Sequence, residues 1–326
     1  MPVSLTIGAD DDGRRLDRVL RKHLSALPLS AIHRLLRMGG ALVDGRKASA
    51  SDRLRTGSVL TLPDSAAAAT GDRKAGGSAS AILPPLDIVW EDKDILVVSK
   101  DAGILVHGEA SLEEAVLARL SGTLEPSLSF KPGPLHRLDR GTSGLVAFSV
   151  SIRGARIFSE ALRSRLIRKR YLAILEGSIG DAEEWEDQLE RDKAARITRV
   201  VAGADAADGS AATTKVLPLA RSPAFSLAIV EIGTGRTHQI RSQAASRGHP
   251  LSGDVKYGGR YADGGFFLHA YELAVPEGAG LTLPSRLIAI PPPRFLRRTS
   301  ELFGAEMARG LAERLPTDTL RPTRHV

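Results

Sequence analysis

Apolar residues near the start of the chain recur at the spacing of two short helices. The first apolar stripe follows the pattern i, i+3, i+4, i+8, at Leu16, Val19, Leu20 and Leu24. Ser30 is a candidate N-cap for a second helix, which Gly39-Gly40 would end. Asp44-Gly45 is typical of a hairpin turn, and residues 59–62 follow as a strand. The pattern predicts a small unit of two helices and a β-ribbon over residues 1–63.

The hydrophobic pattern stops after this unit. Over residues 64–81, 13 of 18 positions are Ala, Gly or Ser, which have little surface to bury. We expect a flexible Ala/Gly/Ser linker over residues 64–83, with an alanine-rich helical spacer as the alternative. A second small-residue stretch, residues 202–212, lies between strand-like segments and predicts a long internal loop.

Short apolar runs with polar breaks fill the rest of the chain. The runs that predict strands are 88–90, 95–98, 104–106, 145–148, 172–175, 227–232 and 266–268. The segments that predict helices are 112–120, 152–166 and 238–245. Because strands outnumber helices without regular alternation, we expect an α+β domain with a mixed, mainly antiparallel sheet over residues 84–300. A weak helix and a basic tail are expected over 301–326.

Charge is unevenly distributed over the 326 residues, which carry 45 Lys and Arg against 38 Asp and Glu. Residues 1–63 hold eleven basic and six acidic residues, and so contribute +5 of the net +7. This balance favours an anionic partner such as nucleic acid or an acidic membrane, although a simple solubility excess is the alternative. No leader or apolar run of about 18 residues is visible, so we expect a soluble cytoplasmic protein without a membrane partner.

Several classes of chemistry are excluded by residues that are missing. The chain has no cysteine, which excludes disulfides, thiol nucleophiles and cysteine-based metal sites. It has no P-loop, no dinucleotide-binding glycine pattern and no serine elbow. The eight histidines form no pair at i, i+4, which argues against a zinc site. We therefore expect no metal and no cofactor, nucleotide cofactors included.

Three polar segments beside predicted strands are candidates for chemistry. Asp139 stands among arginines in a Gly/Ser/Thr turn before an apolar strand, where a turn cap with a surface ion pair is the alternative. A basic cluster over residues 163–170 by itself predicts a solvated face, and Tyr171 follows it. Arg236 and Arg241 lie where a strand turns through glycines into a helix, and could hold a carboxylate or a phosphate.

The N-terminal unit resembles the S4-like RNA-binding domain. The resemblance is carried by RLDRVL at 15–20, PLSAIHRLLRMGGALVDG at 28–45 and LRTGSVLTL at 54–62. It implies that the basic faces of the two helices hold phosphates of structured RNA, through Arg14, Arg15, Arg18, Arg34 and Arg37. An amphipathic helical pair with a solvated basic face is the alternative.

The larger domain resembles the RluA-type family of pseudouridine synthases. Five motifs occur in the family's order: HRLDRGTSGL at 136–145, KRYLAILEG at 169–177, GTGRTHQIR at 233–241, RGHPLSGDVKYGG at 247–259 and LHA at 268–270. The upstream WEDKDILVVSKDAGILVHG at 90–108 also matches, whereas the sequence after Gly280 departs from the family's usual ending. The resemblance implies the pseudouridine synthase fold, an isomerase that uses no cofactor, and RNA as the partner.

The resemblance also implies roles for single residues. Asp139 would be the catalytic carboxylate, Tyr171 would lie against the target base, and Arg241 would pair with Asp139. The target uridine must leave the RNA stack, and Arg137 is the candidate to fill the gap, with Arg140 as a phosphate contact. Whether Asp139 attacks the sugar, attacks the ring or removes a sugar proton stays open. His136 is expected to bond the local backbone, and His238 to belong to the scaffold or the pocket wall.

The leading hypothesis is a monomeric RNA pseudouridine synthase. The domain arrangement favours large-subunit ribosomal RNA, and transfer RNA remains an alternative. A non-catalytic RNA-binding or ribosome-assembly factor of the same fold is the alternative from another class. The presence of Asp139, Tyr171 and Arg241 together favours the enzyme.

Overall fold

The computed structural model describes residues 2–67, 82–123, 127–202, 209–278 and 280–313. The N-terminal unit contains β1 (Val3–Thr6), η1 (Ala9–Asp11), α1 (Leu16–His23), α2 (Leu29–Arg37), β2 (Leu42–Val43), β3 (Arg46–Lys47), β4 (Val59–Leu62) and α3 (Asp64–Ala67). Its four strands form one antiparallel sheet in the order β1-β4-β2-β3. The apolar stripes of α1 and α2 face this sheet and form a separate core.

The local signals in this unit were mostly correct. Asp44 and Gly45 have φ of +50° and +76°, as a turn of type I′ between β2 and β3 requires. Ser30 does not cap α2, because the helix already begins at Leu29, with Pro28 as the N-cap. The expected linker also begins later than residue 64, because α3 occupies residues 64–67 and Ala66 is buried in the N-terminal core. The rest of the expected linker up to residue 81 lies outside the described residues.

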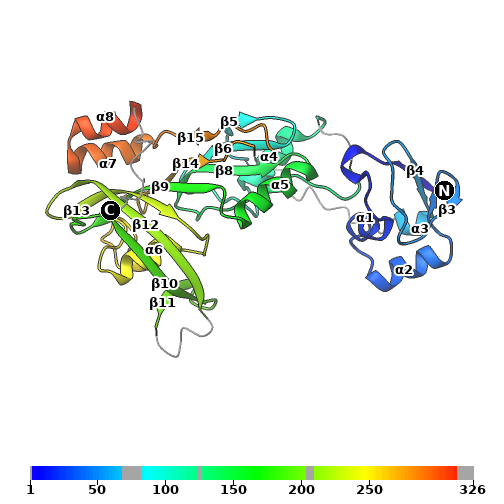
Figure 1. Cartoon of the computed structure of the whole chain (residues 1–326), viewed down its shortest axis with the longest axis horizontal. Helices are drawn as coiled ribbons and strands as arrows, with labels where there is room; N and C mark the ends of the chain where they lie inside the picture. The colour runs from blue at the N-terminus through cyan, green and yellow to red at the C-terminus, as the bar shows by residue number, and fades with distance from the viewer. Residues whose placement is uncertain (1, 68–81, 124–126, 203–208, 279, 314–326) are drawn as a thin grey trace, which may run out of the picture.

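The larger domain is built on one long sheet (Figure 1). Its first half contains β5 (Asp87–Glu91), β6 (Ile95–Lys100), α4 (Leu112–Leu120), β7 (Gly133–Pro134), β8 (Ser143–Ser149), α5 (Ile152–Arg163), β9 (Arg168–Glu176) and β10 (Glu183–Asp192). Then follow β11 (Ile197–Val201), β12 (Ser210–Arg221), β13 (Phe225–Ile232), α6 (Gln239–Ser246), η3 (Val255–Tyr257), β14 (Leu268–Ala274), β15 (Arg286–Ile288), α7 (Pro293–Phe303) and α8 (Ala305–Glu313).

The strand order of the sheet confirms the predicted fold class. Eleven strands form the sheet, with the path β11-β10-β12-β13-β9-β14-β8-β6-β5 and with β15 and β7 paired to β14 and β8. Among the strands that the structure describes, β8 and β14 alone pair in parallel, so the sheet is mixed and mainly antiparallel. Gly144 permits this central pairing, because a Cβ at that position would lie 2.1 Å from the carbonyl oxygen of Ala270.

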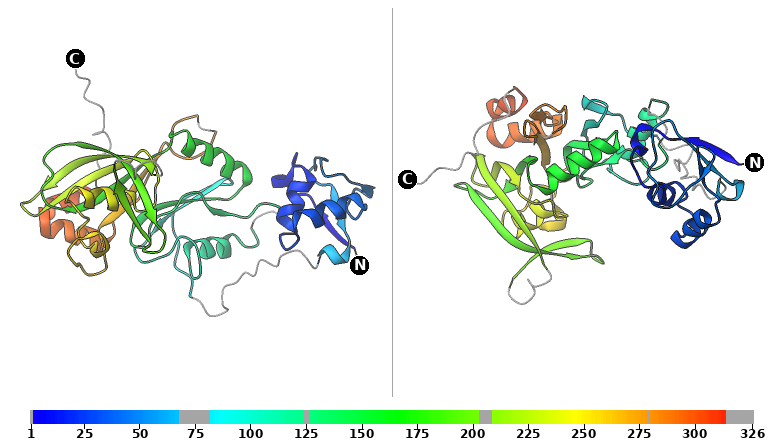
Figure 2. Two further views of the ribbon diagram at one scale, coloured as in Figure 1. Left: turned by 90° about the horizontal axis from the view of Figure 1, so that it is seen from below. Right: turned by 45° about the vertical axis from the view of Figure 1, so that its right-hand side comes forward.

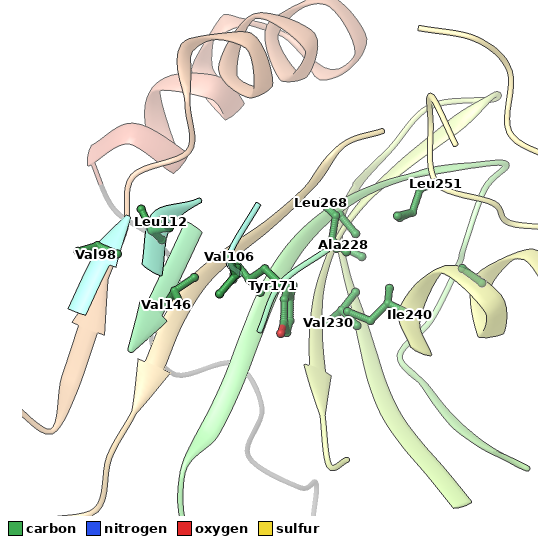
Figure 3. Close-up of a cluster of buried hydrophobic side chains, with 14 of the residues drawn as sticks. Val98, Val106, Leu112, Val146, Tyr171, Ala228, Val230, Ile240, Leu251 and Leu268 are labelled. Atoms are coloured by element: carbon green, nitrogen blue, oxygen red, sulfur yellow. The ribbon is translucent and has the colours of Figure 1, made fainter. Parts of the chain in front are cut away.

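Alternate residues of the central strands face two different cores. Leu96 and Val98 of β6 belong to the core that α4 and α6 cover, whereas Ile95 and Val97 face the core under α5. In β9, Tyr171 points into the α4 and α6 side and Leu172 into the cluster under α7 and α8. Figure 3 shows Tyr171 within the first of these cores, near Val106 and Val230. The face of the sheet that carries α4 and α6 therefore also carries Tyr171.

The sequence predictions for this domain failed in three places. The segment 104–106 forms no strand, and β10 was not predicted. Strands β11 and β12 occupy the strand-like sequence on either side of the expected loop 202–212, but residues 210–212 of that loop belong to β12. These three strands form an arm that extends from the sheet (Figures 1 and 2), with solvent on much of its surface. A helix was expected after residue 301, and α8 lies there, but α7 begins earlier, at Pro293, and was not predicted. The two helices pack through Phe295 and Leu311. The basic tail and residues 203–208 of the expected internal loop lie outside the described residues.

The N-terminal unit contacts the larger domain through a buried carboxylate. Asp11 is fully buried and accepts hydrogen bonds from the backbone N–H of Leu128, at 2.7 Å, and from the hydroxyl groups of Ser127 and Ser129. The Arg14 guanidinium donates to Ser129 as well. Leu128 packs against the N-terminal core, so polar and apolar contacts coincide there. Within the ranges described, no helix combines the length and apolarity needed to cross a bilayer.

Candidate active site

Asp139 lies in the loop between β7 and β8, on the side of the sheet where Tyr171 and α6 are found. Lys100, at the end of β6, holds this loop in place. Its buried ammonium donates to the carbonyl oxygens of Asp101 and Ile104, at 2.9 Å each, and of Arg140, at 3.2 Å. Burial lowers the pKa of Lys100 to about 8, against the opposing charges of Asp101 and Asp139. The lysine thus ties the Asp139 loop to the loop that follows β6.

Arg241, in the first turn of α6, holds two carboxylates. Its Nε and Nη2 donate to the two oxygens of Asp254, both at 2.7 Å, and its Nη1 donates to Oδ2 of Asp139 at 3.3 Å. The guanidinium lies between the rings of Tyr257 and Phe266, at 4.8 and 4.4 Å from the ring centroids. Burial disfavours its charge, but the hydrogen bonds and charges of Asp254 and Asp139 outweigh burial and raise the pKa of Arg241.

Tyr171, on β9, forms the apolar floor of the site. The residue is 6% exposed, and burial, together with the nearby charge of Asp139, raises the pKa of its phenol well above the ordinary value. The side chain is therefore a neutral phenol at physiological pH. The ring belongs to the same hydrophobic cluster as Ile240 and Leu268 (Figure 3), which fixes its orientation.

A cavity of about 190 Å³ joins these residues. Its walls include Asp139, Tyr171, Arg241, His238 and Lys169. The volume is below the roughly 300–1,000 Å³ of sites for drug-sized ligands, so the cavity suits a group about as large as one nucleobase. The structure thus brings together the three residues that the sequence analysis selected as catalytic.

Two basic residues of the cavity have no partner within the described part of the chain. Arg137 is exposed at the mouth and makes neither a hydrogen bond nor an ion pair there. Lys169 is partly buried, and its ammonium would lie 3.2 Å from a Cβ at Gly235. Burial lowers the pKa of Lys169. Both cations face the cavity without a protein carboxylate to neutralise them, which favours an anionic ligand.

The expectation of a solvated basic face over residues 163–170 was wrong at its end. Lys169 lines the cavity, and Arg170 is 6% exposed. The Arg170 guanidinium donates to Glu231 at 2.7 Å and to the buried Glu272 at 3.3 Å. These carboxylates stand opposite Arg170 on β13 and β14, the two strands that flank β9. Arg163, Arg165 and Arg168 are exposed, as expected.

The histidines near the site are uncharged parts of the framework. His136 accepts a hydrogen bond from the N–H of Ala147 at 3.1 Å, and burial lowers its pKa to about 3. This geometry confirms the expectation that it bonds the local backbone. His238 lies at the start of α6 with φ of +54°, a conformation that costs about 1–3 kcal/mol outside glycine. Its Nε2 is 3.8 Å from Oδ2 of Asp139, so it forms part of the pocket wall.

The arginines predicted to bind RNA fall into two groups. Arg18, Arg34, Arg37 and Arg137 are exposed. Arg14 instead lies in the contact between the two domains, with 13% of its side chain exposed, so the structure gives it a structural role. Arg15 pairs with Asp17 at 2.8 Å, and Arg140 donates from Nε to the carbonyl of Gly103 at 2.9 Å. These two are partly committed to protein contacts.

Sequence reasoning did not select four residues that complete the site. They are Lys100, Asp254, Tyr257 and Phe266, which anchor the loop, clamp Arg241 and cover its faces. All except Phe266 lie within quoted motifs, but nothing local assigned them a role. Chemically, the site presents one partly exposed carboxylate, held by a buried guanidinium, in a cavity that the ring of a neutral tyrosine also lines. That arrangement can stabilise positive charge or supply a nucleophile next to a flat, neutral ring.

Comparison with known proteins defines the class to which this site belongs. The family model of RNA pseudouridylate synthase matches residues 94–246, which contain Asp139, Tyr171 and Arg241. This match identifies residues 94–246 as similar to an RNA pseudouridylate synthase domain, and the curated relatives of the chain are ribosomal large subunit pseudouridine synthases, which are isomerases. The match to the family model begins at residue 94 and does not include the N-terminal unit. The S4-like character of that unit stays a prediction.

Individual relatives match most of the chain. Ribosomal large subunit pseudouridine synthase C of Escherichia coli (strain K12) is 29% identical over 265 residues, which cover 79% of this chain and 81% of that protein. The Haemophilus influenzae protein of the same name is 29% identical over 283 residues, covering 82% and 85%. Human RNA Pseudouridylate Synthase Domain Containing 4 superposes with a TM-score of 0.54 at 22% identity, over 66% of this chain and 92% of that one, and shows the shared fold.

Proposed function

We propose that this protein converts uridines of large-subunit ribosomal RNA to pseudouridine, with Asp139 as the catalytic carboxylate. The observation that carries the proposal is the contact of 3.3 Å between Asp139 and the buried Arg241, in a cavity whose floor is Tyr171. The choice of RNA is supported by the relatives named as ribosomal large subunit pseudouridine synthases.

Asp139 must stay ionised when a base closes the cavity over it. Removal from water favours the neutral acid and would raise the pKa of an isolated carboxyl group. The Arg241 guanidinium opposes this effect, because it remains charged and donates directly to Oδ2 of Asp139. Asp254 keeps the guanidinium in place by binding its other edge. The Arg241 guanidinium is thus placed to stabilise a negative charge on Asp139 when a base covers the cavity.

The isomerisation breaks the bond between N1 of uracil and C1′ of the ribose, turns the detached ring, and forms a bond between C5 and C1′. N1 then carries a proton, and the hydrogen of C5 is lost to solvent, so nothing else is consumed. Tyr171 provides a flat surface on which the loose ring can turn. Because burial keeps its phenol protonated, it can donate a hydrogen bond or relay a proton, but it is not a phenolate base.

The target nucleotide has to leave the RNA stack before it can enter the cavity. Unstacking and unpairing cost about a few kcal/mol. We propose that Arg137 fills the vacated space, because it stands exposed at the mouth and has no partner among the described residues. Arg18, Arg34 and Arg37 of the N-terminal unit are exposed as well, and we propose that they hold phosphates farther along the RNA.

The proposal is tested with the variant Asp139→Asn, which keeps the shape of the side chain and removes its charge. We expect the wild-type protein to release tritium from large-subunit ribosomal RNA transcribed with [5-³H]uridine, and Asp139→Asn to release none while its Kd for the RNA stays within about twofold. Asp181→Asn, at an exposed carboxylate that does not line the cavity, is the matched control and should behave as wild type. Turnover by Asp139→Asn would refute the assignment of the carboxylate. Wild-type release from transfer RNA alone would refute the choice of substrate.

A further inference from the structure

Two side-chain nitrogen atoms face the same oxygen of Asp139, one at hydrogen-bond distance and one beyond it. Nη1 of Arg241 is 3.3 Å from Oδ2, and Nε2 of His238 is 3.8 Å from that same atom. Oδ1 has no hydrogen-bond partner among the residues that the structure describes. The carboxylate is therefore held by one oxygen, and the other is available for a substrate in the cavity.

The other side of His238 is fixed by Tyr257. Nδ1 of His238 lies 2.8 Å from the Tyr257 hydroxyl, and the two rings meet edge to face. The hydroxyl oxygen also accepts a hydrogen bond from the backbone N–H of Thr198, on β11, at 2.9 Å. A chain of contacts therefore runs from β11 through Tyr257 and His238 to Asp139.

The proton positions in this chain follow from the chemistry of its members. A neutral imidazole donates from one nitrogen and accepts at the other. With its oxygen already accepting from the N–H of Thr198, the phenol has its own proton left to donate. Among the described residues, Nδ1 of His238 is the acceptor at hydrogen-bond distance, at 2.8 Å, although the Thr198 hydroxyl also lies near the phenol. Nε2 must then carry the imidazole proton. The opposite tautomer would aim the lone pair of Nε2 at the negative Oδ2 of Asp139, which is repulsive.

We propose that His238 is a positioning residue, held by Tyr257 as the Nε2–H tautomer. Its Nε2–H is directed at Oδ2 of Asp139 across 3.8 Å and favours the orientation in which Oδ1 is presented to the substrate. The effect of His238 on the reaction rate rests on the proposed function, whereas its tautomer does not. Burial lowers the pKa of His238, which agrees with a neutral imidazole even though Asp139 opposes that shift and Arg241, Arg191 and Lys256 also surround it.

Tyr257→Phe is the discriminating variant. It retains the ring that covers Arg241 at 4.8 Å and removes the hydroxyl, which selects the tautomer and also accepts from the N–H of Thr198. Tyr261→Phe makes the same change at a side chain that is 78% exposed, and is the matched control. His238→Gln retains an N–H donor near the position of Nε2, whereas His238→Leu retains bulk without a donor.

The first measurement is the ¹⁵N spectrum of full-length protein labelled at histidine, at neutral pH and without RNA. The signals missing from His238→Gln assign His238. We expect a protonated Nε2 and a bare Nδ1 in wild type and Tyr261→Phe, and a mixture of tautomers in Tyr257→Phe. A protonated Nδ1 in wild type, or an unchanged spectrum in Tyr257→Phe, would overturn the inference. Because no RNA is present, this result does not depend on the proposed function.

The second measurement is the single-turnover rate of tritium release at saturating ribosomal RNA transcript. Loss of one oriented hydrogen bond should lower the rate of Tyr257→Phe about two- to tenfold. His238→Leu should lose at least as much, and His238→Gln should recover part of it. If wild type is active and Tyr257→Phe or His238→Leu matches its rate, the positioning role is wrong. If wild type itself releases no tritium from any RNA, the proposed function fails instead.

Discussion

Arg241 and Asp254 form a buried ion pair that supports Asp139, the proposed catalytic carboxylate. This support can be tested separately from Asp139 itself. Asp254→Asn leaves Asp139 and Arg241 in place and changes one oxygen of the clamp into an NH₂ group. That group is a donor and faces a second donor on the guanidinium, so one of the two contacts of 2.7 Å becomes repulsive. We expect the variant to be both less stable and slower.

The magnitude follows from the burial of the pair. The side chains of Arg241 and Asp254 are 8% and 1% exposed, so water cannot replace the lost contact. Removing one partner of a buried ion pair costs about 3–5 kcal/mol, and the lower end applies because the amide oxygen still accepts one N–H. In a domain of this size, 1 kcal/mol shifts Tm by about 2–4 °C, so the expected decrease is about 6–12 °C.

The effect on the rate comes from the position of the guanidinium. With one edge released, Arg241 can turn within the space between the rings of Tyr257 and Phe266, and its donor moves relative to Oδ2 of Asp139. Displacements of about 1 Å in a catalytic arrangement can cost up to about a hundredfold in rate. We therefore expect a single-turnover rate that is about ten- to a hundredfold lower, with little change in the Kd for RNA.

Thermal unfolding gives the Tm of Asp254→Asn. Tritium release, measured well below that Tm, gives its single-turnover rate. Asp181→Asn makes the same substitution at an exposed position and should alter neither. A wild-type Tm for Asp254→Asn would refute the contribution assigned to the buried pair. A lower Tm with an unchanged rate would show that the orientation of Arg241 does not matter for the reaction.

Two further predictions concern stability and domain contact. The folded pKa of His136 and His269 is about 3 and about 4, below the value of about 6.5 in an unfolded chain, so unfolding takes up protons between these values and stability falls as the pH drops below 6.5. In urea titrations from pH 7 to 4, the free energy of unfolding should fall with decreasing pH in both proteins. The fall should be smaller in His269→Gln than in wild type, by about 1.4 kcal/mol per pH unit, and equal slopes would contradict this. Asp11→Ala leaves the N–H of Leu128 without its partner and should raise the radius of gyration measured by small-angle X-ray scattering, whereas an unchanged radius would exclude a docking role.

Strands that are buried on both faces were predictable from the sequence. The arm that β10, β11 and β12 form was not. Residues of β6 alternate between two apolar cores, so an uninterrupted apolar run marks the strand. In β10, Trp185 and Leu189 are the members of the core, and acidic and polar residues surround them. Such a strand has too few apolar positions for period-2 reasoning to detect.

The centre of the site was predictable because its residues lie in recognisable motifs. Its support was not, since it depends on contacts between distant segments. Nothing in the sequence near Arg241 indicates that Asp254 will meet it after the turn of α6. Arg170 looked solvated within a basic run, yet its partners Glu231 and Glu272 arrive on neighbouring strands. Arg14 likewise became a domain contact through Ser129, 115 residues away.

The most direct test of the central claim is a map of pseudouridines in the total RNA of cells that lack this protein. One or a few positions of large-subunit ribosomal RNA should contain uridine in place of pseudouridine. Expression of the wild-type protein should restore those positions, and Asp139→Asn at equal abundance should not. An unchanged map in the deletion strain, or restoration by Asp139→Asn, would contradict the account.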